Sequence, residues 1–130
     1  MLARCDTVDL AQGAVVYAPG QPLTHAYFPL RAFISLVMPM EASDAVEVGL
    51  VGSEGMVGIP LALGVNRSPV RAVVQGGGSA LRVDAKHFCA TLGRSRALQQ
   101  EVDRYVFVHL TQLAQTVGCT RFHFVEARLA

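Results

Sequence analysis

Short runs of apolar and β-branched residues, separated by glycine and proline, dominate the chain up to about residue 83. Runs of this length and composition are typical of β-strands. The tetrapeptide 18–21 places Pro19 and then Gly20 at its centre, as a type II turn requires. Short strands at such close spacing favour a sandwich, jelly roll or barrel over a βαβ sheet. We expect strands at 7–10, 14–17, 25–28, 33–38, 46–51, 70–75 and 80–83.

The stretch 46–60, VEVGLVGSEGMVGIP, joins an alternating strand directly to a glycine-rich loop. Gly52, Gly55 and Gly58 follow one another at intervals of three, and the residues after Gly55 are mostly apolar. Glycines at this density indicate positive φ angles or a close approach of the backbone to another group. The stretch therefore predicts either a short helical turn that closes a pocket or a glycine-rich hairpin with a buried tip.

The hydrophobic period changes after residue 83. Asp84 is suited to cap a short helix over 85–92, which Gly93 would end. Ser95 can cap a much longer helix that extends to about Gly118. Along that helix, apolar residues recur every three or four positions: Leu98, Val102, Val106, Leu110, Leu113 and Val117.

Tyr105, Val108 and His109 widen this apolar band beyond a single stripe. We therefore expect one side of the long helix to pack on the β-domain and the other on a twin helix. The alternative is that the whole band lies on its own domain, since it is not a strict heptad repeat.

The last residues, FHFVEARLA, predict the start of a third helix after a break at Gly118, with Thr120 as its cap. Because the sequence stops inside that helix, it suggests a piece cut from a longer polypeptide.

Composition narrows the class of protein. The chain has 130 residues, 52% of them hydrophobic, which is enough for one domain with its own core. Eleven basic residues are spread along the sequence and the net charge is +1, which is unlike a nucleic-acid-binding domain. The lack of an eighteen-residue apolar run and of a secretory signal predicts a soluble, cytoplasmic protein without membrane contact. Cys5, Cys89 and Cys119 are widely spaced, which fits reduced thiols.

Catalytic and metal-binding patterns are not found in the sequence. His25, His87, His109 and His123 are scattered and form neither H-x-H nor H-x-x-x-H, so we expect no metal site and no cofactor. Neither a Ser/His/Asp set nor a phosphate-binding loop of the Walker type is visible, and we expect no enzymatic activity. A β-roll is also the scaffold of metal-dependent cupin enzymes, and a bound metal would be needed to support that alternative.

Five segments taken in order carry a resemblance to a known family: LAQGAVVYAPGQ, YFPLRAFISLV, VEVGLVGSEGMVG, VVQGGGSALRV and GCTRFHFVEARLA. Together they resemble the bacterial Crp/Fnr family of transcription regulators. The resemblance implies a mainly β fold with helices: an eight-stranded β-roll of the cyclic-nucleotide-binding type (a double-stranded β-helix or jelly roll), a short helix and a long dimerisation helix. Residues 1–93 would be the effector-sensing roll and 94–118 the dimerisation helix. Residues 119–130 would be a hinge and the start of a DNA-binding domain, whose recognition helix would lie beyond Ala130.

The resemblance also implies a place for an effector. In members that bind cyclic AMP, the loop after the central strand holds the cyclic phosphate through an arginine and backbone N–H groups. Gly58 matches the glycine of that loop, whereas Ile59 stands where those members have an acidic residue that accepts the ribose hydroxyl. Either Arg67 with Ser68, or Arg71, would hold the phosphate. The implied ligand-binding residues are Gly52, Gly55, Gly58, Ile59, Arg67, Ser68 and Arg71.

The resulting functional prediction is an effector-sensing and dimerisation domain that couples small-molecule binding to DNA binding by the absent domain. A cyclic nucleotide is the candidate effector, and a second copy of the chain is the predicted partner along the long helix. The alternative is a degenerate β-roll without a nucleotide ligand. In it, Ile59 and Pro60 fill the nucleotide's place, and the domain acts in dimerisation or partner contact.

Overall fold

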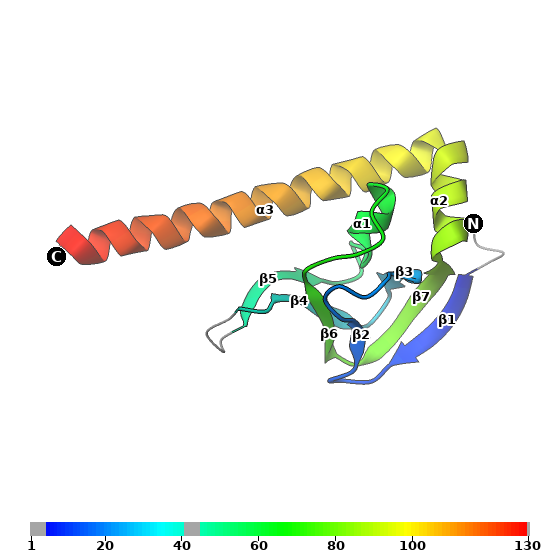
Figure 1. Cartoon of the computed structure of the whole chain (residues 1–130), viewed down its shortest axis with the longest axis horizontal. Helices are drawn as coiled ribbons and strands as arrows, with labels where there is room; N and C mark the ends of the chain where they lie inside the picture. The colour runs from blue at the N-terminus through cyan, green and yellow to red at the C-terminus, as the bar shows by residue number, and fades with distance from the viewer. Residues whose placement is uncertain (1–4, 41–44, 130) are drawn as a thin grey trace.

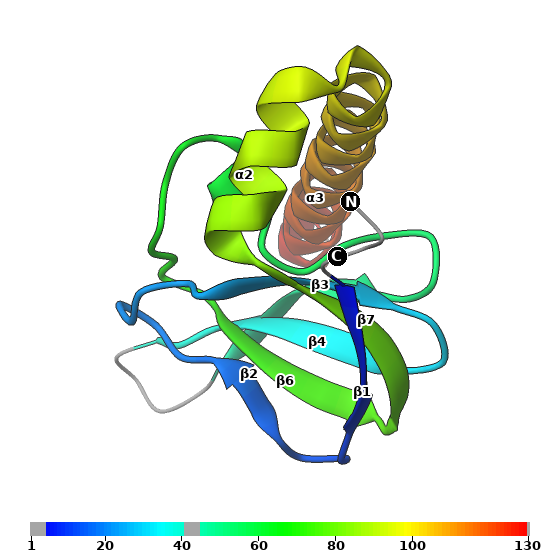
Figure 2. The same ribbon diagram turned by 90° about the vertical axis from the view of Figure 1, so that its right-hand side faces the viewer.

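The computed structural model describes residues 5–40 and 45–129, with side chains described as far as residue 115. Its strands lie in two antiparallel layers, and its helices gather at one side of the roll (Figure 1, Figure 2). The first sheet has the strand order β1 (Cys5–Leu10), β7 (Gly78–Asp84), β3 (His25–Pro29). The second sheet has the order β2 (Val15–Tyr17), β6 (Arg71–Gly76), β4 (Phe33–Met38), β5 (Val46–Val51).

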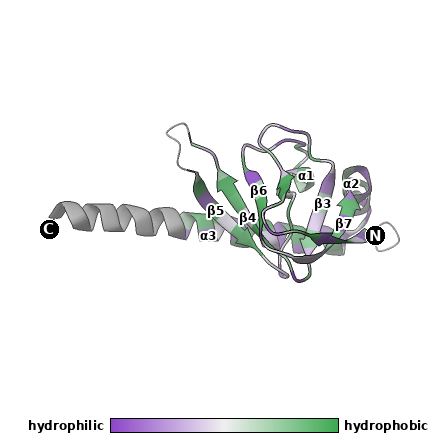
Figure 3. Ribbon diagram, turned by 90° about the horizontal axis from the view of Figure 1, so that it is seen from below, coloured by the Kyte–Doolittle hydropathy of each residue, from purple (hydrophilic) through white to green (hydrophobic). Residues whose placement is uncertain are grey.

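The second sheet is built around β4, whose apolar sequence FISLVM stands out in Figure 3. Ile34 of β4 lies opposite Val74 of β6 on one side and opposite Val51 of β5 on the other. All three side chains are fully buried. Cross-strand contacts between β-branched side chains stabilise a sheet, so this row fixes the register at the centre of the roll.

All seven strands expected from the sequence are present, with ends shifted by at most two residues. Gly20 has a φ of 77°, the positive angle that the predicted type II turn requires. The eighth strand implied by the resemblance is absent from the described residues. In its place Val57 and Tyr27 form an isolated bridge, exchanging N–H···O bonds of 2.8 and 2.9 Å. The positive φ of Gly58 and the ring of Pro60 end the extended backbone there.

Directly after this bridge lies α1 (Ile59–Ala62), so the glycine-rich loop contains the predicted helical turn and not a hairpin tip. The helix α2 (Ala85–Arg94) begins as expected: Asp84 caps it by accepting a 3.1 Å hydrogen bond from the His87 N–H. Gly93, however, lies within α2 and does not end it.

The helix α3 (Arg96–Leu129) contains 34 residues, which corresponds to about 51 Å at about 1.5 Å per residue, and it extends far past the roll (Figure 1). Ser95 caps it, accepting a 3.1 Å hydrogen bond from the Leu98 N–H. The predicted break at Gly118 and the predicted third helix are wrong, because α3 is continuous through both. A single interior glycine costs a helix only about 1 kcal/mol, and no proline follows it in 119–129 to enforce a stop.

The three helices and the first sheet share one hydrophobic core. Val102 of α3 is buried in this core together with Phe88 and Leu92 of α2. Met56 and Leu61, from the loop and α1, complete the contact between α3 and the roll. The glycine-rich loop is thus held between the β-roll and the long helix.

Candidate functional site

A cavity of about 270 Å³ lies where the second sheet, the α1 loop and α3 meet. Its polar side chains are Tyr17, Ser68 and His109, and the other lining residues are apolar or glycine. The lining residues are Tyr17, Leu36, Met38, Val48, Met56, Val57, Gly58, Ile59, Pro60, Ser68, Val70, His109 and Leu113. Because His109 and Leu113 belong to α3, the cavity has one wall on the roll and another on the long helix.

The α1 side of the cavity depends on Gly58. Its φ of 113° is strongly disfavoured for other residues, and a Cβ there would lie 3.4 Å from Ala26 Cα. Two features limit the backbone donors at the start of α1. Pro60 has no N–H, and the Leu61 N–H already donates to the Gly58 carbonyl at 3.0 Å.

On the α3 side, two aromatic side chains lie against glycines. A Cβ at Gly49 of β5 would lie 2.9 Å from His109 Cε1, and a Cβ at Gly55 would lie 2.5 Å from Tyr105 Oη. A larger residue at either position would force the ring of His109 or Tyr105, or α3 itself, to move. These glycines therefore serve close packing of the helix, whereas Gly58 serves backbone conformation.

Burial controls the titration of both aromatic groups. It raises the pKa of Tyr105, although a hydrogen bond with the Met56 backbone opposes the shift. Burial lowers the pKa of His109 below its ordinary value, so at neutral pH the imidazole presents a neutral donor and acceptor to the cavity.

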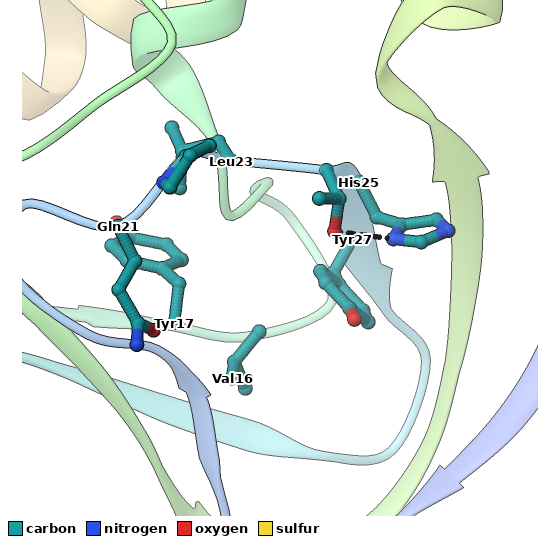
Figure 4. Close-up of a pocket in the computed structure, with 8 residues that line it drawn as sticks. Val16, Tyr17, Gln21, Leu23, His25 and Tyr27 are labelled. Atoms are coloured by element: carbon teal, nitrogen blue, oxygen red, sulfur yellow. Dashed lines mark hydrogen bonds between the residues drawn. The ribbon is translucent and has the colours of Figure 1, made fainter.

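Tyr17 forms the far wall of the cavity. Its hydroxyl is hydrogen-bonded to Ser68, and burial raises its pKa. Ser68 is itself buried and accepts a 3.1 Å hydrogen bond from the Val70 N–H. On its other side Tyr17 borders an outer cavity of about 350 Å³ in the 16–27 segment, where Figure 4 shows it beside Gln21.

The structure separates the two halves of the predicted ligand site. Gly58, Ile59 and Ser68 line the cavity, whereas Arg67 and Arg71 do not. The Arg67 guanidinium is exposed and donates to the Gly20 carbonyl, and Arg71 is exposed at the start of β6.

The other two predicted glycines also lie outside the cavity lining. Gly55 is packed under Tyr105. A Cβ at Gly52 would lie 3.1 Å from Glu54 Oε2 and 3.2 Å from Phe33 Cε1, which again indicates close packing.

Most of the residues predicted for the dimer seam face their own domain. Val102 is buried in the core, Leu98 and Val106 pack against it, and Leu113 lines the cavity. This follows from helix geometry, because positions spaced three or four apart lie on one side of a helix. Leu110 is 58% exposed. Val117 lies beyond the residues whose side chains are described.

A different side of α3 is apolar and open. Phe107 is 69% exposed, and Leu110 and Ala114 follow it at i+3 and i+7. This surface, Phe107, Leu110 and Ala114, is called the outer face of α3 below.

Sequence reasoning did not assign Tyr17, His109 or Leu113 to a ligand cavity. A signal for two of them exists, since His109 and Leu113 lie three and seven positions after the core-facing Val106 and share its side of α3. No comparable local signal marks Tyr17, because its role depends on sheet pairing.

Within residues 5–40 and 45–129 no helix is long and apolar enough to cross a membrane. Among the side chains that the structure describes, which end at residue 115, no group of three or more His, Cys, Asp or Glu could hold a metal ion.

The antiparallel roll, the α1 loop and the long C-terminal helix together define a fold of the cyclic-nucleotide-binding type. Among solved structures, the chain is similar to CLP of Xanthomonas campestris, a c-di-GMP-responsive global regulator, with a TM-score of 0.78 and 14% identity. That match covers 90% of this chain and 59% of CLP.

The chain is also similar to a mutant of CooA from Carboxydothermus hydrogenoformans, with a TM-score of 0.76 and 12% identity, over 99% of this chain and 82% of CooA. A third similar structure is the sensor domain of the transcriptional regulator DNR from Pseudomonas aeruginosa, with a TM-score of 0.60 and 16% identity, over 97% of this chain and 77% of that domain. All three are regulators of the Crp/Fnr family. At these identities the likeness concerns the fold. No protein-family model and no curated protein sequence matches the chain.

Proposed function

We propose that this chain is the effector-sensing and dimerisation part of a transcription regulator of the Crp/Fnr family. The observation that carries the proposal is the shared cavity, to which α1 contributes Ile59, the loop before β6 contributes Ser68, and α3 contributes His109 and Leu113. The fold matches the effector-binding domains of such regulators, which supports a sensing function.

The mechanism is a shift between two positions of α3. A molecule in the cavity touches both walls, so its affinity depends on where His109 and Leu113 lie relative to the α1 loop. A ligand shifts such an equilibrium by the difference between its affinities for the two states. In this proposal, α3 transmits the change to a helix-turn-helix domain joined to its end, which contacts DNA.

Dimerisation is assigned to the outer face of α3. Apolar residues at i, i+3 and i+7 form a stripe along one side of a helix, and two such stripes bury each other in a symmetric pair. Of the dimer-interface residues predicted from the sequence, Leu110 remains in the proposed interface. Phe107 and Ala114 take the place of the predicted residues that face the core.

Light scattering tests this assignment. The wild-type chain should have twice the 13.9 kDa chain mass, and Leu110→Asp should return it to one chain because it places a carboxylate in the apolar stripe. Val65→Asp, at a 50% exposed loop position, is the matched control and should remain dimeric. A monomeric wild type, or a Leu110→Asp variant of unchanged mass, would refute the dimerisation part of the proposal.

The degenerate alternative, in which Ile59 and Pro60 fill the nucleotide's place, receives less support. Both residues border a cavity of about 270 Å³ that they leave open.

A further inference from the structure

We propose that the cavity receives an uncharged, largely apolar small molecule and not a cyclic nucleotide, an inference that rests on the sensing function proposed above.

The thirteen lining residues include no Arg, Lys, Asp or Glu. Arg67 is bonded to the Gly20 carbonyl, and Arg71 is exposed on β6. A phosphate that enters these apolar walls without a cation loses part of its hydration without compensation, which costs up to several kcal/mol. The site therefore lacks the partner that a cyclic phosphate needs.

Few backbone donors are available at the start of α1 to replace that cation. The helix α1 has four residues, its Pro60 has no N–H, and the Leu61 N–H is already bonded to Gly58. The side chain of Ile59 also offers no carboxylate to a ribose hydroxyl. A volume of about 270 Å³ also lies near the small end of ligand pockets, which run from about 300 to 1,000 Å³.

The polar groups that remain suit a neutral ligand. The Tyr17 hydroxyl beside Ser68 and the imidazole of His109 can each donate or accept a hydrogen bond. Burial keeps His109 neutral at neutral pH. An aromatic or aliphatic body with one amide or hydroxyl group matches this set, because the apolar walls desolvate the body and the polar groups orient its head.

Benzamide and benzoate provide a direct test, since they have the same shape and differ in charge at pH 7. Each is titrated into the chain, as is cyclic AMP, while the methyl resonances of Ile59, Val70 and Leu113 are followed by NMR. We expect saturable shifts at these methyls with benzamide, affinity at least about tenfold weaker for benzoate, and no shift with cyclic AMP.

Two single-atom variants locate the polar contact. Tyr17→Phe and Ser68→Ala should each weaken benzamide binding by about threefold to tenfold, as expected for one lost neutral hydrogen bond. Tyr27→Phe removes a hydroxyl that borders the outer cavity and not this one, so it should leave the affinity unchanged.

Binding of benzoate or cyclic AMP at these methyls with affinity equal to or above that of benzamide would overturn the inference. So would the absence of benzamide shifts up to its solubility limit. These results would leave the dimer assignment intact, because the chain mass and the Leu110→Asp variant test that assignment separately. A monomeric wild-type chain would instead contradict the dimerisation part of the proposed function.

Discussion

Two stretches of α3 have similar apolar sequences and different surroundings. In the first, 98–106, the apolar side chains turn to their own domain, with Val102 in the core and Tyr105 over Gly55. In the second, 107–115, one side lines the cavity through His109 and Leu113, while the outer face is open. Hydrophobic periodicity thus indicates that a helix side is buried, but the tertiary structure decides what buries it.

The largest expected effect lies in the first stretch. Val102→Asp places an unpaired charge at a position that is 5% exposed, and we expect it to lower the free energy of unfolding by about 3–5 kcal/mol. Urea denaturation measures the loss. Val65→Asp, the same change at a half-exposed loop residue, should cost less than about 0.5 kcal/mol. Equal losses in the two variants would contradict the anchoring of this stretch.

A second change tests the close contact between the loop and α3. Gly55→Ala puts a methyl group into the space held by Tyr105, and we expect a loss of about 1–3 kcal/mol, as for overpacking. Gly93→Ala is the matched control, because nothing lies within 4 Å of its added Cβ and the residue lies within α2. It should stabilise the chain by up to about 1 kcal/mol, since alanine favours helix. A neutral Gly55→Ala would show that Tyr105 has room to move.

The smallest expected effect belongs to the second stretch and concerns pH. Because burial lowers the pKa of His109, above about pH 6.5 the group is neutral in both the folded and unfolded states and has no effect. As the pH falls below about 6.5, the unfolded chain binds this proton first. Stability is then lost until the folded-state pKa is passed.

Thermal melts from pH 7.5 to 5 should therefore show a weaker acid-side decline for His109→Gln than for the wild type. His87→Gln, on α2 and outside the cavity lining, is the control for removal of a histidine. A decline that His109→Gln leaves unchanged would place the responsible protons elsewhere.

Features of the sequence that act locally are predicted well. Asp84 and Ser95 cap their helices as expected, because a cap depends on residues within one turn. Gly58 has the positive φ that its setting suggests.

Features that depend on distant contacts are not predicted. The direction of Arg67 is set by a carbonyl 47 positions earlier in the chain, that of Gly20. One local feature is also predicted wrongly: α3 continues through Gly118, because the competing local preferences there differ by only about 1 kcal/mol. Of the residues predicted for ligand binding, Gly58, Ile59 and Ser68 line the cavity, because the course of the backbone brings them there.

The central claim is that occupancy of the cavity is linked to the second stretch of α3. Amide hydrogen exchange of the chain, measured with and without saturating benzamide, tests it most directly. We predict slower exchange at residues 109–113, with little change at 98–102, because the ligand contacts the first of these segments and the second is already fixed in the core. Saturated binding with unchanged exchange at 109–113 would contradict the link between the cavity and the helix.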